Sequence, residues 1–286
     1  MAGITSVGVV GLGLIGRALT RRLLQTGDPP FVFDVRPEAI AAAVADGAQA
    51  TSSSRELAER SDLVIVCVQT DEQCIRAVSG PDGVLDGAPP GACVAVLSTV
   101  TPATIEALAP LASERGVDLV DTPVAGRGMF SVAEGTMSVL VGGEGEIVER
   151  LRPTLNRFAS KVVSAGQLGS GAALKLAHNI VVYAGFAAMI EAVELASAAG
   201  VRDGLVEEVA EASGALSDLS AFSLPFYKHF RDDPHAPDED EILRVTSALV
   251  DKDLTDAVKL AQAHGLTLPV AQLLSHSGTR IFPVGR

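Results

Sequence analysis

The stretch Val7-Gly8-Val9-Val10-Gly11-Leu12-Gly13-Leu14-Ile15-Gly16 decides how this chain of 286 residues folds. The apolar run 6–10 is followed at once by three glycines, and apolar residues at helical spacing then continue to Gly27. A second apolar run, 31–33, ends in Asp34. Strand, glycine turn, helix, strand and acid therefore follow one another within about thirty residues, in the order of a dinucleotide-binding βαβ unit.

Each part of this pattern has a physical task. Gly11 permits a tight turn, Gly13 lets the backbone approach a pyrophosphate, and Gly16 lets the helix lie close to the strand. The helix N-terminus offers unpaired N–H groups and a positive dipole end to the phosphates. We therefore predict dinucleotide binding rather than a glycine turn without a ligand. The predicted contacts in the loop are Gly11, Leu12, Gly13, Leu14, Ile15 and Gly16.

The acid at the end of the second strand bears on which nicotinamide cofactor is bound. Asp34 is placed to accept hydrogen bonds from the adenosine ribose hydroxyls, and it repels a 2′-phosphate, which favours NAD. Arg36 stands two residues further on and is able to pair with that phosphate. We predict NAD, with NADP left open by Arg36.

Strand and helix signals alternate through the first half of the chain, which predicts a mostly parallel, doubly wound sheet. Ligands of such sheets bind beyond the carboxyl ends of the strands. Val68 and Gln69 follow one buried apolar run, and Ser98 and Thr99 follow the next. Val68, Gln69 and Thr99 are therefore predicted to line the cofactor. The alternative for Ser98 and Thr99 is that they merely cap the next helix.

The second half reads as helical, with one long proline-free helix from about Gly171 to Ala199. An irregular stretch is expected over 213–237. We predict a Rossmann-type domain over 1–165 and an all-helical domain over 166–286, joined by the long helix. Lys175 and Asn179 are four apart and so share one face of it. A desolvated lysine is suited to moving protons, whereas the alternative is a lysine that reaches out to solvent.

Composition excludes several classes of function. The net charge of −13 disfavours nucleic acid and anionic membranes as partners. The long helix is the most apolar segment, but charged residues interrupt it, so no membrane span is expected. Cysteine is present three times without metal-ligand spacing, which predicts a reduced, cytoplasmic protein with no bound metal.

Four separated blocks resemble the β-hydroxyacid dehydrogenase family, which includes 3-hydroxyisobutyrate dehydrogenases and glyoxylate/succinic semialdehyde reductases. The first is the glycine loop with Asp34. The second is DTPVAGRGMFSVAEGTMSVLVGG over 121–143, which is similar to the family's substrate segment. The third is GSGAALKLAHN over 169–179, and the fourth is DKDL over 251–254. Together they cover nearly the whole chain.

The resemblance implies roles for particular residues. It places the catalytic chemistry on Lys175 and Asn179, and Lys252 of the fourth block beside the cofactor. It also implies that the backbone around Ala125, Gly126 and Arg127 holds the substrate acid. The family's usual Ser-Gly-Gly is replaced there, so a hydroxyl is lost and a guanidinium appears. Arg127 is interpreted as a carboxylate clamp, with a surface arginine as the alternative.

The residues and the resemblance together predict reversible hydride transfer between a nicotinamide cofactor and a small 3-hydroxy acid, or the matching aldehyde or keto acid. Lys175 handles the proton. Two alternatives stay open: an enzyme resembling imine reductases, which generally lack this lysine, and a dinucleotide-binding module without turnover. The expected partners are a small carboxylate substrate and a second copy of the chain, because the alanine-rich long helix needs more cover.

Overall fold

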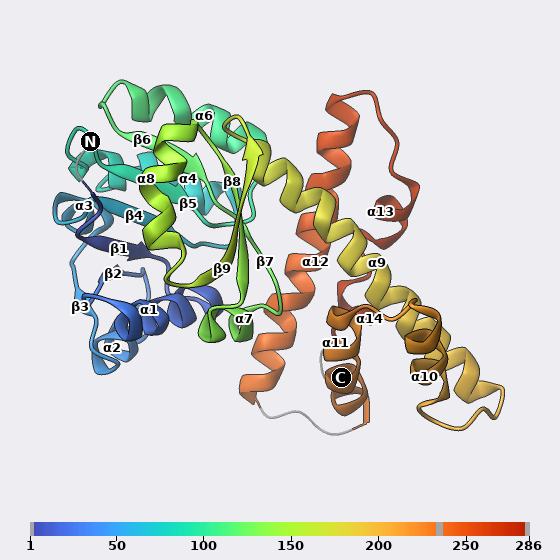
Figure 1. Ribbon diagram of the computed structural model, residues 1–286. Helices are drawn as coiled ribbons and strands as arrows, with labels where there is room; N and C mark the ends of the chain where they lie inside the picture. Colours follow the sequence, from blue (N-terminus) through green and yellow to red (C-terminus); the bar gives the residue numbers. More distant parts are fainter. Residues whose placement is uncertain (1–2, 233–236, 284–286) are drawn as a thin grey trace. The chain divides into compact units, whose positions relative to one another are not determined.

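The computed structural model describes residues 3–232 and 237–283, and the chain divides into two compact units, Met1–Lys175 and Leu176–Arg286. The first unit is a sheet with helices on both faces (Figure 1), as the alternating apolar runs predict. Its strands are β1 Val7–Val10, β2 Phe31–Phe33, β3 Gln49–Ala50, β4 Leu63–Val66, β5 Cys93–Val96, β6 Asp118–Asp121, β7 Val124–Ala125, β8 Met137–Gly142 and β9 Ala159–Gly166. Its helices are α1 Leu14–Thr26, α2 Pro37–Ala45, α3 Ser54–Glu59, α4 Asp71–Ser79, α5 Val84–Gly87, α6 Pro102–Ser113, α7 Met129–Glu134 and α8 Gly145–Leu155.

The sheet has the order β3-β2-β1-β4-β5-β6-β8-β7, and β9 pairs with β8 as a further partner of that strand. All pairings from β3 to β6 are parallel, which is the doubly wound arrangement of a dinucleotide-binding fold. Strand β8 runs antiparallel to both β6 and β7, and parallel to β9. The predicted fold class is confirmed for this half of the chain.

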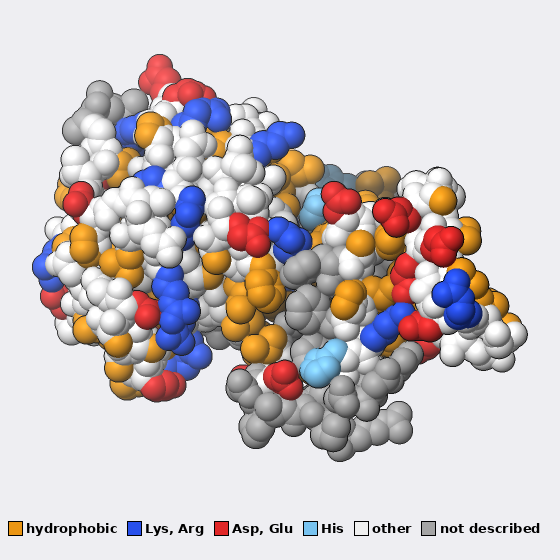
Figure 2. Space-filling view, turned by 60° about the horizontal axis from the view of Figure 1, so that its bottom comes forward, with side chains coloured by type: hydrophobic (Ala, Val, Ile, Leu, Met, Phe, Trp, Pro, Cys, Tyr) orange, Lys and Arg blue, Asp and Glu red, His pale blue; other side chains and the backbone are white. Residues whose placement is uncertain are grey.

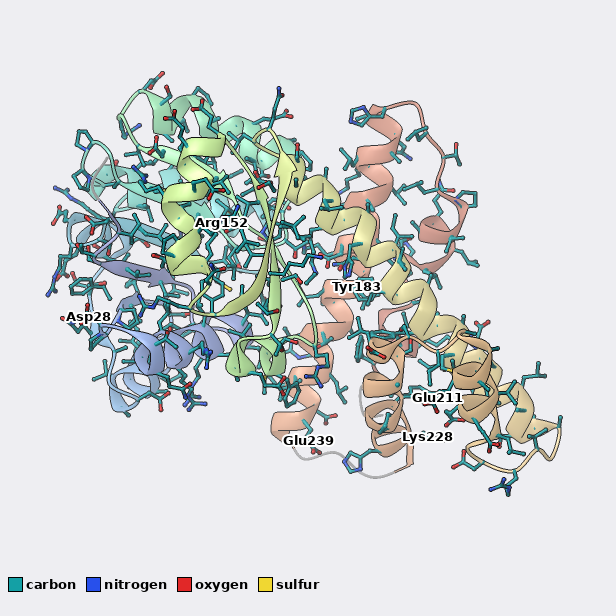
Figure 3. All side chains as sticks on the ribbon, viewed as in Figure 1. Asp28, Arg152, Tyr183, Glu211, Lys228 and Glu239 are labelled. Atoms are coloured by element: carbon teal, nitrogen blue, oxygen red, sulfur yellow. The ribbon has the colours of Figure 1, made fainter. Side chains whose placement is uncertain are left out.

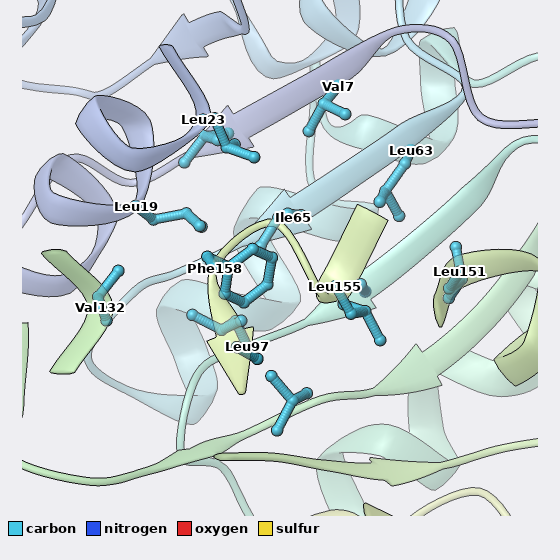
Figure 4. Packing of buried hydrophobic residues seen from close by; sticks show 14 of the residues in the cluster. Val7, Leu19, Leu23, Leu63, Ile65, Leu97, Val132, Leu151, Leu155 and Phe158 are labelled. Carbon is cyan, nitrogen blue, oxygen red and sulfur yellow. The ribbon is translucent and has the colours of Figure 1, made fainter. Parts of the chain in front are cut away.

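Alternate residues of the central strands enter two separate cores. Leu63 and Ile65 of β4 face the core that contains residues of α1, α2, α7 and α8, which Figure 4 shows around Phe158. Val64 and Val66 face the core shared with α3, α4, α5 and α6. All four side chains are fully buried, which explains why the strand reads as a continuous apolar run rather than an alternating one.

All the regular secondary structure among the described residues of the second unit is helical. Its core joins residues of five helices, among them Phe186, Ile190, Leu224 and Leu254. Its helices are α9 Ser170–Ala198, which begins in the first unit, α10 Leu205–Ser213, α11 Asp218–Asp232, α12 Pro237–Ala263, α13 Pro269–Leu274 and α14 Gly278–Ile281.

Helix α11 corrects the expectation of an irregular stretch over 213–237. The helix spans Asp218–Asp232 and continues through Pro225. A proline lacks one donor and crowds the preceding turn, but packing on the helical core compensates: Leu224 and Tyr227, on either side of it, are both buried.

Helix α9 is, by length and composition, apolar enough to cross a membrane, with a mean hydropathy of 1.6 over its most apolar window. Of that window, 28% is buried within the protein, and Phe186, Ile190 and Val193 from the helix belong to the core of the second unit. On the face drawn in Figure 2, acidic and basic side chains are interspersed with apolar ones. The absence of a membrane span stays a prediction.

Candidate functional site

One edge of the sheet gathers the ends of five strands. Val10 at the end of β1 pairs with Phe33 of β2 on one side and with Val66 of β4 on the other. Val66 in turn pairs with Val96 of β5, and Val96 with Asp121 of β6. Because these strands are parallel and in register, the loops that follow them all leave from the same edge, which we call the carboxyl edge.

The glycine loop leaves the carboxyl edge after β1 and has the geometry that its sequence predicts. Gly11 has a φ of +94°, and a Cβ there would lie 2.2 Å from the carbonyl oxygen of Cys67. A Cβ on Gly16 would lie 1.9 Å from the oxygen of Gly11, so the helix approaches the strand only without a side chain. A Cβ on Gly13 would meet nothing within 4 Å. Space for a phosphate therefore lies in front of Gly13, at the N-terminus of α1.

Asp34 lies at the end of β2 with an exposure of 8%. Its Oδ2 accepts a hydrogen bond of 2.7 Å from Leu12 N, which ties the glycine loop to the neighbouring strand. Arg36 donates to the same carboxylate from its backbone N and its Nε at 2.9 and 3.0 Å, and from Nη2 at 3.2 Å. Burial raises the pKa of Asp34, but the hydrogen bonds from Arg36 and Leu12 outweigh it and hold the pKa below its usual value.

The loops after β4 and β5 contain the other residues predicted to line the cofactor. Val68 is half-buried and Gln69 is exposed. Val68 N donates a 2.7 Å hydrogen bond to the hydroxyl of Ser98, so this buried serine joins the two loops. The hydroxyl that caps α6 belongs to Thr101, which accepts from Thr104 N. Neither Ser98 nor Thr99 is therefore the N-cap, and Thr99 is half-buried at the carboxyl edge.

Asp121 connects the end of β6 with the start of α9, a contact that the sequence reading missed. Its Oδ1 accepts a hydrogen bond from Gly169 N and its Oδ2 one from Ala172 N, both at 2.7 Å. The carboxylate is 1% exposed, and burial raises its pKa although these N–H groups act in the opposite direction. Helix α9 thus begins at the carboxyl edge, and the half-buried Lys175 follows Ala172 by three residues.

The predicted substrate segment leaves the same edge after Asp121. Ala125 and Arg127 are half-buried, and Gly126 between them is exposed. Arg127 N donates a 2.8 Å hydrogen bond to the buried hydroxyl of Ser131. The Arg127 side chain donates from Nη2 to Glu134 Oε2 at 2.6 Å, so in this structure the guanidinium is paired with a carboxylate of the chain itself.

Within the second unit, Asn179 belongs to a buried polar network. Its Nδ2 donates a 2.6 Å hydrogen bond to Oδ2 of Asp253. Tyr183, labelled in Figure 3, donates its hydroxyl to the same oxygen at 3.2 Å. Lys252 Nζ lies 2.8 Å from Asp253 Oδ1 and 3.5 Å from Asp256 Oδ2. Two of the predicted site residues, Asn179 and Lys252, therefore both contact the buried carboxylate of Asp253.

Comparison with known proteins assigns the family. Residues 6–167 match the NAD-binding domain family of 6-phosphogluconate dehydrogenase, which is more than half of the chain. The chain belongs to the β-hydroxyacid dehydrogenase family. Residues 169–277 match the domain described as NAD-binding of NADP-dependent 3-hydroxyisobutyrate dehydrogenase, which agrees with the β-hydroxyacid dehydrogenase assignment over the helical half.

Individual proteins that the chain is similar to agree with this assignment. An uncharacterized oxidoreductase of Mycobacterium tuberculosis strain H37Rv is 33% identical over 93% of this chain and 90% of its own. The 3-hydroxyisobutyrate dehydrogenase of Pseudomonas aeruginosa is 30% identical, with 94% and 89% covered. The crystal structure of a 3-hydroxyisobutyrate dehydrogenase from Salmonella typhimurium has a TM-score of 0.82 at 28% identity, with 98% and 95% covered.

Proposed function

We propose that this β-hydroxyacid dehydrogenase transfers a hydride reversibly between a nicotinamide cofactor and a small 3-hydroxy acid or the corresponding carbonyl compound. The observation that supports it best is the carboxyl edge, where the glycine loop, Asp34 and the start of α9 meet. In the proposed division of labour, residues 1–165 bind the dinucleotide and residues 166–286 complete the substrate site. The nicotinamide ring supplies or accepts the hydride, and the protein handles the proton.

Lys175 is the proton-handling residue of this proposal. In the oxidative direction its neutral amine accepts the proton of the substrate hydroxyl. In the reductive direction its ammonium polarises the carbonyl group and then donates the proton. The partly buried position of Lys175, on a helix that starts at the carboxyl edge, supports this role over that of a lysine reaching out to solvent.

Asn179 contributes one N–H of its side-chain amide to the substrate in this proposal. A carboxylate only accepts hydrogen bonds, so the bond to Asp253 requires that the amide nitrogen faces Asp253. The amide nitrogen carries two N–H groups, so one bonds Asp253 and the second donates to the substrate oxygen, while the amide oxygen lies 3.4 Å from Nδ1 of His178. This refines the expectation that Asn179 binds either the substrate oxygen or its carboxylate.

Arg127 holds the substrate carboxylate in this proposal, together with the backbone N–H groups around Ala125 and Gly126. In the present structure Glu134 takes the place of that carboxylate on the guanidinium. Both side chains are partly exposed, so the internal pair is weak and an incoming acid is able to exchange for it. Arg127→Ala is expected to raise KM for acids while leaving the affinity for NADH unchanged.

A substrate panel tests the proposed function. The full-length protein is mixed with NAD or NADP and small 3-hydroxy acids, and with NADH or NADPH and the matching carbonyl compounds, while the absorbance of the reduced nicotinamide is followed. Turnover of a 3-hydroxy acid is the expected result. Tight NADH binding without turnover of any member would instead support a dinucleotide-binding module.

The proposal extends to assembly and location. Apolar side chains such as Val181 and Leu195 of α9 and Leu273 of α13 are more than 70% exposed, and a second copy of the chain would cover them. A homodimer or higher homo-oligomer in the cytoplasm is the expected state. Size-exclusion chromatography with light scattering measures it directly, and a monomer at micromolar concentration would contradict it.

A further inference from the structure

Asp121 makes a contact that the proposed chemistry does not itself use. The residue ends β6, and its carboxylate receives the N–H groups of Gly169 and Ala172, 48 and 51 residues further along the chain. The first N–H groups of a helix have no partner within the helix and are usually satisfied by a polar side chain just before it. Gly169 has no side chain that could accept these hydrogen bonds, so the carboxylate of Asp121, at the end of β6, accepts them instead.

Two glycines leave room for the Asp121 carboxylate, because a Cβ at either position would clash with it. A Cβ on Gly142 of β8 would lie 2.3 Å from Asp121 Oδ1. A Cβ on Gly171 would lie 2.8 Å from Asp121 Oδ2 and 2.5 Å from the oxygen of Leu140. These two glycines belong to the second and third blocks of the sequence. Their common feature is close approach to Asp121, so they form a socket for its carboxylate.

The socket lies one helical turn before Lys175. Residues three apart on a helix project from the same side, so the direction of the Lys175 side chain follows from the placement of Ala172. Ala172 is held twice, by its N–H bond to Asp121 and by the burial of its side chain in the core shared with α6. Every rotation or shift of this first turn relative to β6 therefore moves the amine relative to the carboxyl edge.

We infer that Asp121 is a positioning residue, which holds the first turn of α9 on β6 and so sets where the Lys175 amine stands for proton transfer. This inference rests on the proposed role of Lys175. A positioning role differs from a purely structural role in one respect: removing the Asp121 carboxylate should slow the chemical step only while Lys175 is present. A misplacement of about 1 Å at a reacting group costs about 100-fold in rate.

A double-mutant cycle on the full-length protein tests the inference, with the 3-hydroxy acid that the panel shows to be turned over fastest. Asp121→Asn keeps the size of the side chain but turns one acceptor into a donor facing an N–H. We expect kcat to fall about 10- to 100-fold, with little change in KM or in the affinity for NADH. In a Lys175→Ala background the same substitution should lower kcat less than about twofold, because the amine it positions is gone.

The matched control is Asp118→Asn, because Asp118 lies at the other end of the same strand and pairs with Arg150. It should leave kcat unchanged. Equal losses from Asp121→Asn in both backgrounds, or a loss confined to the affinity for NADH, would overturn the inference. Wild-type turnover of Lys175→Ala alone would instead overturn the proposed function, so the two failures are distinguishable.

A second variant covers the case in which Asp121→Asn does not fold. Gly142→Ala retains the carboxylate but adds a Cβ 2.3 Å from its Oδ1, which must shift the anchor. The same fall in kcat, absent in the Lys175→Ala background, is expected. Loss of the folded state in both variants, measured by circular dichroism, would assign the socket to stability alone and overturn the inference.

Discussion

Asn179 and Asp253 are joined by a 2.6 Å hydrogen bond although 74 residues separate them in the chain. The two side chains are each 3% exposed. Tyr183 donates to the same carboxylate, and burial together with Asp253 raises the pKa of its phenol well above the usual value, so the hydroxyl remains a donor. Asp253 therefore decides which end of the Asn179 amide is turned away from it.

Replacing Asp253 should affect turnover and stability together. In Asp253→Asn one acceptor becomes a donor, so the remaining oxygen serves either Asn179 and Tyr183, which share Oδ2, or Lys252, which lies at Oδ1, but not both. We expect kcat to fall and the free energy of unfolding to drop by about 1–3 kcal/mol, as when a buried donor loses its partner. Urea denaturation and steady-state kinetics measure the two effects. Glu241→Gln on the exposed face of α12 is the control and should change neither; wild-type kcat in Asp253→Asn would contradict the role given to the amide.

Lys175→Ala should lower turnover by about 100- to 10,000-fold, the range that general acid–base groups contribute. The affinity for NADH should remain close to that of the wild type, because the glycine loop and Asp34 are untouched. Fluorescence titration with NADH and the rate of absorbance change measure the two quantities. Lys161→Ala, at an exposed position of β9, is the matched control and should behave as the wild type. A Lys175→Ala enzyme with full turnover would remove the mechanism.

Arg36 should decide how well the protein accepts NADP. Its backbone N, Nε and Nη2, together with Leu12 N, occupy the four acceptor positions of the Asp34 carboxylate. Arg36→Ala frees two of these positions for the ribose hydroxyls of NAD and removes the cation available to a 2′-phosphate. We expect the dissociation constant of NADPH to rise at least about tenfold, equivalent to about 1.4 kcal/mol. The dissociation constant of NADH should stay the same or fall.

The control for this comparison is Arg21→Ala, since Arg21 is an exposed residue of α1 that pairs with Asp46. It should leave the ratio of the two dissociation constants unchanged. An unchanged ratio in Arg36→Ala would show that the pair with Asp34 has no part in cofactor choice.

The lowered pKa of Asp34 makes a pH-dependent contribution to stability. A carboxyl whose pKa is lower in the folded state stabilises the protein above its unfolded pKa of about 3.9, and this stability is lost as the pH falls through the folded value. Asp34→Asn should therefore be less stable than the wild type at pH 7, with the difference shrinking below about pH 4. Urea denaturation at pH 7 and pH 3 measures this; a difference that grows on acidification would contradict the sign.

The three cysteine thiols should be unreactive in the folded protein. Burial raises the pKa of Cys67, Cys74 and Cys93 each to about 12, so only about one thiol in 10,000 is ionised at pH 8. A thiol-specific disulfide reagent should give little colour until denaturant is added, and then report three thiols per chain. Rapid reaction of the native protein would show that one of the segments around these cysteines opens readily.

Local patterns carried the prediction of the nucleotide fold well. Gly11 and Gly16 are required by contacts within a few residues or on the adjacent strand, so their spacing alone reveals their tasks. The prediction of an irregular stretch over 213–237 was wrong for α11, because the burial of Leu224 and Tyr227 on either side of Pro225 stabilises the helix and is not visible in the sequence. Asp121 and Asp253 were missed as site residues for the same reason: a single aspartate at the end of a strand or inside a helix carries no periodic signal.

By itself, the sequence determined the doubly wound sheet and the long helix, because apolar periodicity and glycine spacing act over a few residues at a time. The family followed from the four blocks that resemble it. Only the tertiary structure decided that Asp121 accepts hydrogen bonds from the first turn of α9 and that Asp253 orients Asn179. These are the hydrogen bonds of buried or half-buried carboxylates. A buried carboxylate must be satisfied by whatever donors the folded chain brings to it, however distant in sequence.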